Sequence, residues 1–449
     1  MDYQILVQQL ADRAIKAGAD EADVYLRVGR EFEVTIRAGQ IELLKQAQAK
    51  GVGVRVFTEK RMAFSHTTDF SDHTLGELVD NTVRMARHAT QDHFHGLPEQ
   101  VTKPVESRLN QLDLVDPGFD NLSTEQKIAL AREMEQAALR YDKRVKLVEG
   151  ASFSDSAAEV FLANSRGFSG TYAGTGSSLV CSVIAEENGN KEANYWYSSK
   201  RFFSDHQSPE SIGTRAAERA VKMLNARTVP SGKYPVVFDP LLAASFLGFI
   251  AAALNGETVF RKMSFLTEKL GERIGSDLLT IIDDGTMPRG FGSKPFDGEG
   301  MPTRRKVVVE KGILKSYLYD SCTARKARTE STGNAARGTS STPRISPLNF
   351  YVEAGQHSPE EIIRSVAGGF YVTNMIGFGV DTVTGQFSRG ASGYWIKNGE
   401  RAFPVHQVTV ASNMLEMLQN VEMVGDDLNF LGSIASPTLK IREMTVSGR

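Results

Sequence analysis

Residues 21–57 read EADVYLRVGREFEVTIRAGQIELLKQAQAKGVGVRVF, and within them apolar side chains recur at every second position. The recurring positions are Val24, Leu26 and Val28, then Phe32, Val34 and Ile36, then Ile41 and Leu43, then Val52, Val54 and Val56. A period of two is typical of strands that bury one face and leave the other in water. The Ala38-Gly39 pair separates two of these runs, so the segment predicts an antiparallel meander with one solvated face.

Helical spacing surrounds this meander. Apolar residues recur three and four positions apart over residues 3–17, 75–86, 123–141 and 209–224. Thr74 and Glu77 have the spacing of a capping box, and Ser123 and Gln126 repeat it, so each pair is expected to begin a helix. In the strand-rich region that follows, the Asn188-Gly189 pair favours a tight type I′ hairpin.

A polar stretch over residues 225–233, which contains Pro230 and Gly232, is the best candidate for a domain boundary. A chain of 449 residues is long enough for two domains, each with its own core. We therefore expect an α+β protein with an N-terminal domain of residues 1–224, built from a helix and an antiparallel meander, and a C-terminal domain of residues 225–449.

The second half opens with a short predicted strand over residues 234–238 and an apolar run, LLAASFLGFIAAAL, over residues 241–254. The run is well short of the roughly 20 residues that cross a bilayer, so it predicts a helix buried on all sides. Further strands are expected over residues 278–282, 306–309, 313–319 and 402–410, a helix over 412–420 and a last strand over 439–446. Two long loops rich in Gly, Pro, Ser and Thr, residues 283–303 and 328–347, are expected to be functional.

The composition excludes several classes of protein. Lys and Arg number 52 against 54 Asp and Glu, so no overall positive field favours nucleic acid or anionic lipid. The two cysteines, Cys181 and Cys322, lie far apart and support neither a disulfide framework nor a cysteine-rich zinc site. No export signal is recognised after Met1, so a cytoplasmic location without membrane or nucleic-acid partners is expected.

Metal and nucleophile motifs are scarce. None of the eight histidines sits in HExxH or HExxxH, the spacings that place zinc ligands on one helix. The cluster Asp92-His93-Phe94-His95 could bind metal weakly, although two histidines in a polar turn are more often solvated. GxSxG and the phosphate-binding glycine motifs are absent, and Ser388 beside Arg389 is best interpreted as a turn residue.

Several long segments together resemble the TldD/PmbA family, also described as modulators of DNA gyrase, and the PmbA (TldE) branch most closely. The resembling segments are residues 48–57, 255–266, 283–305, 311–327, 331–334, 383–400 and 424–428. The resemblance covers nearly the whole chain and implies a C-terminal domain with a mixed sheet. It also implies a hollow dimer, which in the better-known pair is a heterodimeric zinc metallopeptidase that cleaves unfolded peptides.

The resemblance implies that the zinc motif is missing from this chain. In TldD subunits HExxxH lies on a helix and a later cysteine completes the site. Here those helix positions hold Leu247, Gly248 and Ala252, and the C-terminal region offers Ser433 and Ser436 without a cysteine. We therefore expect no catalytic residue and no metal in this chain, with zinc in a TldD-like partner.

Substrate-contacting residues are also implied only by the resemblance. The loop over residues 328–347 and the segment over 378–393 would border the cavity where the partner's active site works. Arg389, with Ser388, Gly390 and Asn334 beside it, is expected to contact a peptide carbonyl or carboxylate, because a guanidinium suits such groups. The alternative is that Arg389 pairs with an acidic neighbour.

The sequence thus predicts a PmbA-like subunit without zinc ligands, which assists proteolysis of unfolded peptides in peptide maturation or antitoxin degradation. One alternative is a homodimeric peptide-binding or gyrase-related regulator without protease activity. Another is a peptidase whose metal is held by His93 and His95.

Overall fold

The period-two segment forms two very long strands in the computed structural model, which describes residues 2–99 and 111–448. The strands are β1 (Glu21–Arg37) and β2 (Gln40–Thr58), paired antiparallel. Ala38 and Gly39 connect them with φ of 50° and 74°. A type I′ turn needs positive φ at both central residues, which explains the glycine at the second position.

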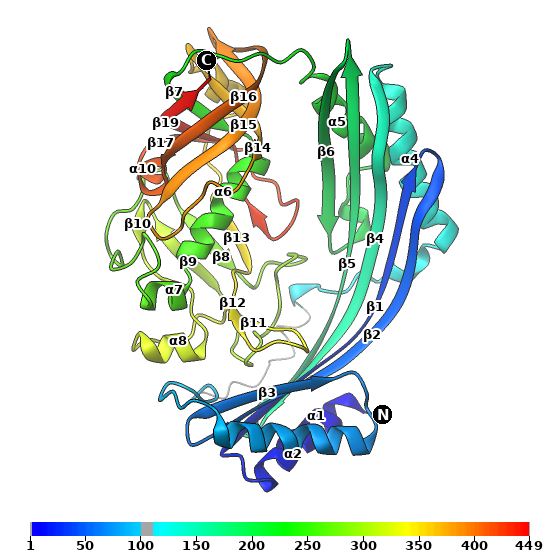
Figure 1. The fold of residues 1–449 in the computed structure, drawn as a ribbon, viewed down its shortest axis with the longest axis vertical. Coiled ribbons are helices and arrows are strands. Elements are labelled where there is room, and N and C mark those ends of the chain that lie inside the picture. Colours follow the sequence, from blue (N-terminus) through cyan, green and yellow to red (C-terminus); the bar gives the residue numbers. More distant parts are fainter. Residues whose placement is uncertain (1, 100–110, 449) are drawn as a thin grey trace.

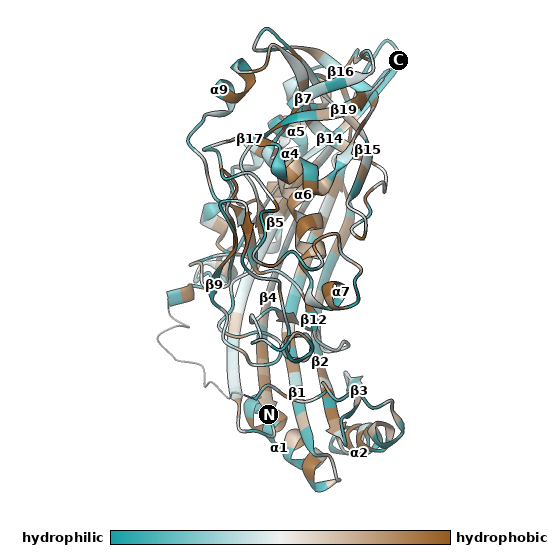
Figure 2. Cartoon of the chain, turned by 90° about the vertical axis from the view of Figure 1, so that its left-hand side faces the viewer, coloured by the Kyte–Doolittle hydropathy of each residue, from teal (hydrophilic) through white to brown (hydrophobic). Residues whose placement is uncertain are grey.

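Six strands make one antiparallel sheet in the order β3-β2-β1-β4-β5-β6. The other four strands are β3 (Arg61–Thr67), β4 (Val145–Asn164), β5 (Ser169–Glu187) and β6 (Asn190–Lys200). Figure 2 shows β1, β2, β4 and β5 extending along the long axis of the molecule. The predicted antiparallel meander is confirmed, and its strands are longer than the alternating runs alone indicated.

Two pairs of helices cover the two ends of this sheet (Figure 1). They are α1 (Tyr3–Lys16) with α2 (Asp72–His88), and α4 (Thr124–Tyr141) with α5 (Pro209–Val221). Two short 3-10 helices are η1 (Phe119–Asn121) and η2 (Phe203–Asp205). Each pair of helices buries a separate hydrophobic cluster against the strands, so one sheet carries two cores.

Helix capping agrees with the sequence at one site and differs at another. Ser123 and Gln126 form the predicted capping box at the start of α4. The expected box at Thr74 is wrong, because α2 begins one turn earlier, where Ser71 caps it and accepts a hydrogen bond from the Thr74 amide at 3.4 Å. The Thr74 hydroxyl instead donates to Asp69 at 2.7 Å.

In the described residues, the C-terminal half contains three further sheets, of which the smallest is a two-stranded ribbon. Its helices are α6 (Pro240–Ala253), α7 (Gly256–Phe260), α8 (Ser321–Lys326), α9 (Pro359–Arg364) and α10 (Met414–Gln419). A five-stranded sheet has the order β10-β9-β8-β13-β18 and comprises β8 (Ile281–Asp284), β9 (Arg305–Glu310), β10 (Ile313–Leu314), β13 (Asn349–Val352) and β18 (Ile434–Ala435). A six-stranded sheet has the order β16-β15-β14-β7-β19-β17 and comprises β7 (Gly232–Phe238), β14 (Gly368–Ile376), β15 (Gln386–Lys397), β16 (Glu400–Asn413), β17 (Val421–Val424) and β19 (Leu439–Ser447).

The six-stranded sheet is mixed, as expected, because β14 pairs parallel with β7 whereas β15 and β16 pair antiparallel. An additional pairing of β16 with β19 curls this sheet towards a barrel. The predicted α+β architecture is therefore confirmed. The division at residue 225 stays a prediction.

Some predicted boundaries in this half were wrong. The strand expected over residues 278–282 lies at β8, and only Ile313–Leu314 of the expected strand 313–319 is extended. The first long loop begins after β8, and the second contains a small ribbon of β11 (Ala335–Ala336) and β12 (Arg344–Ile345). None of the described helices is long and apolar enough to cross a membrane.

Both long loops pack on the long sheet through buried charges. Arg55 of β2 pairs with Asp23 of β1 and, at 3.1 Å, with Glu299 of the first loop. Arg337 of the second loop pairs with Asp23 at 2.7 Å. All four side chains are almost fully buried, so these loops join the two halves of the molecule instead of projecting into water.

Candidate functional site

Helix α6 occupies the centre of the C-terminal half, where the resemblance places a catalytic helix. Asp239 caps it by accepting a hydrogen bond from the Leu242 amide at 2.9 Å, and Pro240 fills its first turn. Its buried face comprises Ala243, Phe246, Leu247, Ile250, Ala251 and Ala253, which join the largest hydrophobic cluster. Its opposite face is not buried, since Ser245 and Ala252 are exposed. The prediction of a helix buried on all sides was therefore wrong for this face.

The three motif positions differ in exposure. Leu247 is 2% exposed and belongs to the core. Gly248 is half-buried, and among the described residues a Cβ built on it would meet only Ile434 Cδ1, at 3.9 Å. Ala252 is exposed, so the open face of α6 is lined with small side chains. Because α6 contains only Pro, Leu, Ala, Ser, Phe, Gly and Ile, it offers no carboxylate, imidazole or thiolate to bind zinc or move a proton.

A cavity of about 840 Å³ lies between α5 and the C-terminal half, beside the first turn of α6. Leu241 and Ala244 of α6 form part of its wall. Arg219 crosses it, pairing with Asp239 at 3.1 Å and donating to the Thr373 carbonyl at 2.8 Å. The cavity therefore lies next to the open face of α6, and part of its lining is polar.

Two further arginines line the same cavity and were not singled out from the sequence. Arg215 stacks on Trp196, with its guanidinium carbon 3.8 Å from the ring centre, and Arg401 lies 4.6 Å above Tyr371. Neither makes an ion pair with another described residue. Burial raises the pKa of Tyr371, so its hydroxyl stays protonated and can donate. Stacked guanidinium groups without a carboxylate partner can bind carbonyl or carboxylate groups of a peptide.

Arg389, the residue chosen from the resemblance, lies on β15 and packs near α6. Its guanidinium carbon is 5.9 Å from the Phe249 ring centre, and its Nε donates to the Gly377 carbonyl at 3.1 Å. No carboxylate of the described residues pairs with Arg389. The alternative, in which Arg389 pairs with an acidic neighbour, is therefore not observed in these residues. Burial lowers the pKa of its guanidinium without neutralising it. Ser388 is exposed on the same strand, so its interpretation as a turn residue was wrong. Gly390, also on β15, is half-buried.

Asn334 lies elsewhere and is fully buried. Its amide nitrogen donates to Asp283 at 2.8 Å and to the Ser346 carbonyl at 3.0 Å, while its oxygen accepts from Thr332 at 2.7 Å. In this structure the Asn334 side chain joins the second long loop to β8, and no part of it is open to a peptide. The structure therefore brings Arg389 close to α6 but does not bring Asn334 with it.

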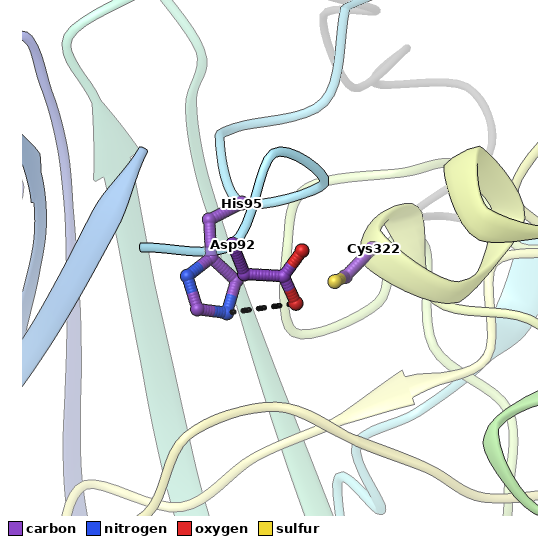
Figure 3. A group of neighbouring side chains, drawn as sticks. All are labelled: Asp92, His95 and Cys322. Carbon is purple, nitrogen blue, oxygen red and sulfur yellow. Dashed lines mark ion pairs between the residues drawn. The ribbon is translucent and has the colours of Figure 1, made fainter. Parts of the chain in front are cut away.

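A second polar group lies at the other end of the C-terminal half, where Asp92 and His95 approach Cys322 of α8 (Figure 3). Their possible ligand atoms all lie within 4.8 Å of one another, and His95 Nε2 is 3.9 Å from an Asp92 oxygen. His93, which the sequence paired with His95, is exposed instead. Cys322 could not be found from the sequence, because it is far along the chain and belongs to no motif.

Comparison with known families gives matches across most of the chain. Models described as PmbA/TldA metallopeptidase domain 1, central domain and C-terminal domain match residues 22–86, 117–224 and 231–448. The Escherichia coli O157:H7 protein described as metalloprotease PmbA is 34% identical over 432 residues, covering 96% of this chain and 93% of that protein. The chain is thus similar to a curated relative over almost the full length of both.

Solved structures share the fold. A Bacteroides thetaiotaomicron protein described as a candidate modulator of DNA gyrase is 28% identical, with a TM-score of 0.91 and coverage of 100% of both chains. TldE from Thermococcus kodakarensis has a TM-score of 0.88 over 98% of this chain and 99% of its own. At 21% identity, that second likeness shows the fold alone.

Proposed function

The chain belongs to the PmbA/TldD metallopeptidase family, and we propose that it is the subunit of a two-subunit peptidase whose catalytic zinc is held by a TldD-like partner. The observation that carries this proposal is the chemistry of α6. At the positions that the resemblance assigns to two zinc ligands and a general base, this helix has Leu247, Ala252 and Gly248. Hydrolysis by a metallopeptidase needs a metal-bound water and a group that takes its proton.

In this proposal the open face of α6 is part of the peptide path. Small side chains at Ser245, Gly248 and Ala252 let an extended backbone approach closely, because they fill little space above the helix. The stacked Arg215 and Arg401 at one end of that face, and Arg389 near Phe249, would hold carbonyl and carboxylate groups of the peptide. The chain then contributes binding and selectivity, and the partner contributes the bond cleavage.

The long sheet supports a role in assembly or in holding extended chains. In the described part of the chain, β2 pairs with β3 only from Val52 onward, so residues 40–51 pair with β1 on one side alone. This edge carries the exposed apolar residues Ile41, Leu43 and Leu44. A free strand edge can accept another strand by β-augmentation, either from a peptide or from a partner subunit.

The second candidate is the homodimeric peptide-binding or gyrase-related regulator. The free edge of β2 is the observation that favours this regulator, because the same edge can pair with a second copy of this chain. For the two-subunit peptidase we also propose a cytoplasmic location, where it would cleave unfolded peptides in maturation or antitoxin degradation.

Native mass spectrometry of the tagged full-length chain, gently purified from its own cells, separates these candidates. The proposal expects a heterodimer whose partner contains HExxxH and zinc, and peptidase activity that requires both subunits. A homodimer that neither copurifies with such a protein nor gains activity when one is added would overturn it and leave the regulatory function.

A further inference from the structure

Asp92, His95 and Cys322 form a compact group at the junction of the two halves of the molecule (Figure 3). Asp92 and His95 follow α2, whereas Cys322 is the second residue of α8. The group opens into a cavity of about 470 Å³ that is also lined by Glu257 and Lys326. None of these residues takes part in the function proposed above.

The scaffold around the group is held firmly. Arg325 of α8 reaches across to the turn that carries Asp92 and His95 and donates to three of its carbonyls, those of Phe94 at 2.7 Å, Gly96 at 2.8 Å and Leu97 at 3.2 Å. A capping box between Asp320 and Thr323 fixes the first turn of α8. The position of Cys322 relative to His95 is therefore set by these hydrogen bonds and does not depend on a ligand.

We propose that Asp92, His95 and Cys322 bind one zinc(II) ion or a similar borderline transition metal, through a carboxylate oxygen, Nε2 and Sγ. This mixture of imidazole, thiolate and carboxylate suits zinc, whereas magnesium and calcium prefer oxygen ligands alone. Tetrahedral bonds of about 2.0–2.3 Å set ligand atoms about 3.3–3.8 Å apart, so small side-chain rotations close the group around the ion. Three protein ligands leave the fourth position to a water molecule in the cavity.

Protons and charges balance at this site. Burial lowers the pKa of His95, so its ring is neutral near pH 7, and Nε2 binds the metal while Nδ1 keeps its proton. Nδ1 is buried and has no hydrogen-bond partner among the described residues. The Asp92 charge and the Lys60 backbone both favour a proton on the ring. Burial raises the pKa of Cys322 to about 11, so metal binding breaks the S–H bond, forms an S–metal bond and releases the proton to solvent.

Lys326 is the main competitor for Asp92. Its ammonium lies 3.8 Å from the Asp92 carboxylate and 3.1 Å from Glu257. A metal bound to the same Asp92 oxygen would lie within about 6 Å of this charge, so Lys326 weakens binding without blocking it. Removing the charge should therefore strengthen metal binding, an effect that a purely structural cluster would not produce.

Cobalt(II) titration of the metal-free, full-length chain tests the proposal, because a thiolate bound to cobalt gives a near-ultraviolet charge-transfer band. The wild type should bind one equivalent and show this band. Cys322→Ser should lose the band. His95→Gln and Asp92→Asn should each weaken cobalt binding by more than about 10–100-fold, which is the loss typical of a residue that only supports a ligand. Lys326→Met should bind at least about tenfold more tightly.

His93→Gln is the matched control, since it removes a neighbouring but exposed imidazole and should leave binding unchanged. The proposal is overturned if the folded wild type binds no cobalt, if the band persists in Cys322→Ser, or if His93→Gln weakens binding as much as His95→Gln does. The titration uses this chain alone, so its failure leaves the two-subunit peptidase untouched. A heterodimer with two zinc ions is expected if both hold, and with one if only the peptidase proposal holds.

Discussion

Replacing Leu247 by Glu should strongly destabilise the C-terminal half, whereas the same replacement at Ala252 should leave its stability almost unchanged. The two positions lie on one helix, but Leu247 is 2% exposed within the largest core and Ala252 faces solvent. Removing a buried leucine beyond Cβ costs about 2.7–5 kcal/mol. Placing a carboxyl in the space left behind costs about 1–3 kcal/mol more, even when it is protonated.

The sum is at least about 4 kcal/mol, a large part of the total stability of a domain. For a unit of this size it corresponds to a fall in melting temperature of about 8–16 °C. Ala252→Glu should stay within about 0.5 kcal/mol of the wild type, which is about 2 °C or less. The pair therefore separates the buried face of α6 from its open face.

Tryptophan fluorescence can follow the C-terminal half alone. The chain has two tryptophans. The Trp395 ring packs edge-to-face on the Tyr234 ring, with 4.9 Å between the ring centres, and both residues belong to the six-stranded sheet on which α6 packs. In a Trp196→Phe background, thermal melting monitored at Trp395 reports this half. The measurement should use the isolated chain, because a partner subunit could cover Ala252. Equal shifts in the two variants, or no shift in Leu247→Glu, would refute the assignment of the two faces.

Three more outcomes follow from particular contacts. Gly248→Ala should raise stability in urea by about 0.5–1 kcal/mol, because the helix gains propensity and the added Cβ meets only one atom, at 3.9 Å; a loss would mean that the open face is filled. Gly53→Ala should lower the free energy of unfolding by about 1–3 kcal/mol, because the added Cβ would lie 2.5 Å from the Thr339 carbonyl oxygen of the second long loop. An unchanged urea midpoint would show that this loop does not cross β2 there. Burial lowers the pKa of His206 to about 4. Between about pH 6.5 and pH 4 only the unfolded chain therefore binds a proton at this imidazole. As the pH falls through this window, the free energy of unfolding should fall by up to about 3 kcal/mol. In His206→Asn that part of the slope should vanish, and a wild-type curve that is flat below pH 6.5 would contradict the assignment.

The sequence predicted the parts of the fold that depend on local chemistry. Alternation over residues 21–57 predicted the β1–β2 hairpin, and Ser123 predicted the start of α4, because strand period and capping are properties of neighbouring residues. It placed α6 correctly but not its open face, since Ser245 and Ala252 are small enough to fit either a core or a surface. Burial of small residues is decided by what lies opposite them, which the sequence does not state.

Contacts between distant segments were the main limit for the candidate sites. Arg389 could equally have paired with an acid. The carbonyls that it contacts lie at the end of β14 and just after it, and the sequence does not show that this segment passes beside Arg389. The approach of Cys322 to Asp92 and His95 depends on the docking of the two halves. The family resemblance, which uses many segments at once, predicted the architecture and the missing zinc motif but carried no information on that group.

The pairing of β1 with β4 has a consequence for how the chain is made. Val24 of β1 lies opposite Ala163 of β4, so the central strand pair of the long sheet cannot be completed until residue 163 has left the ribosome. At about 5–20 residues per second, the β1 edge waits roughly 10 s after its own synthesis with its ladder groups unpaired. High contact order of this kind slows folding, and an exposed strand edge invites association with other nascent chains. Cotranslational protection of the first 140 residues is therefore expected to limit the yield of the protein more than the stability of its finished fold.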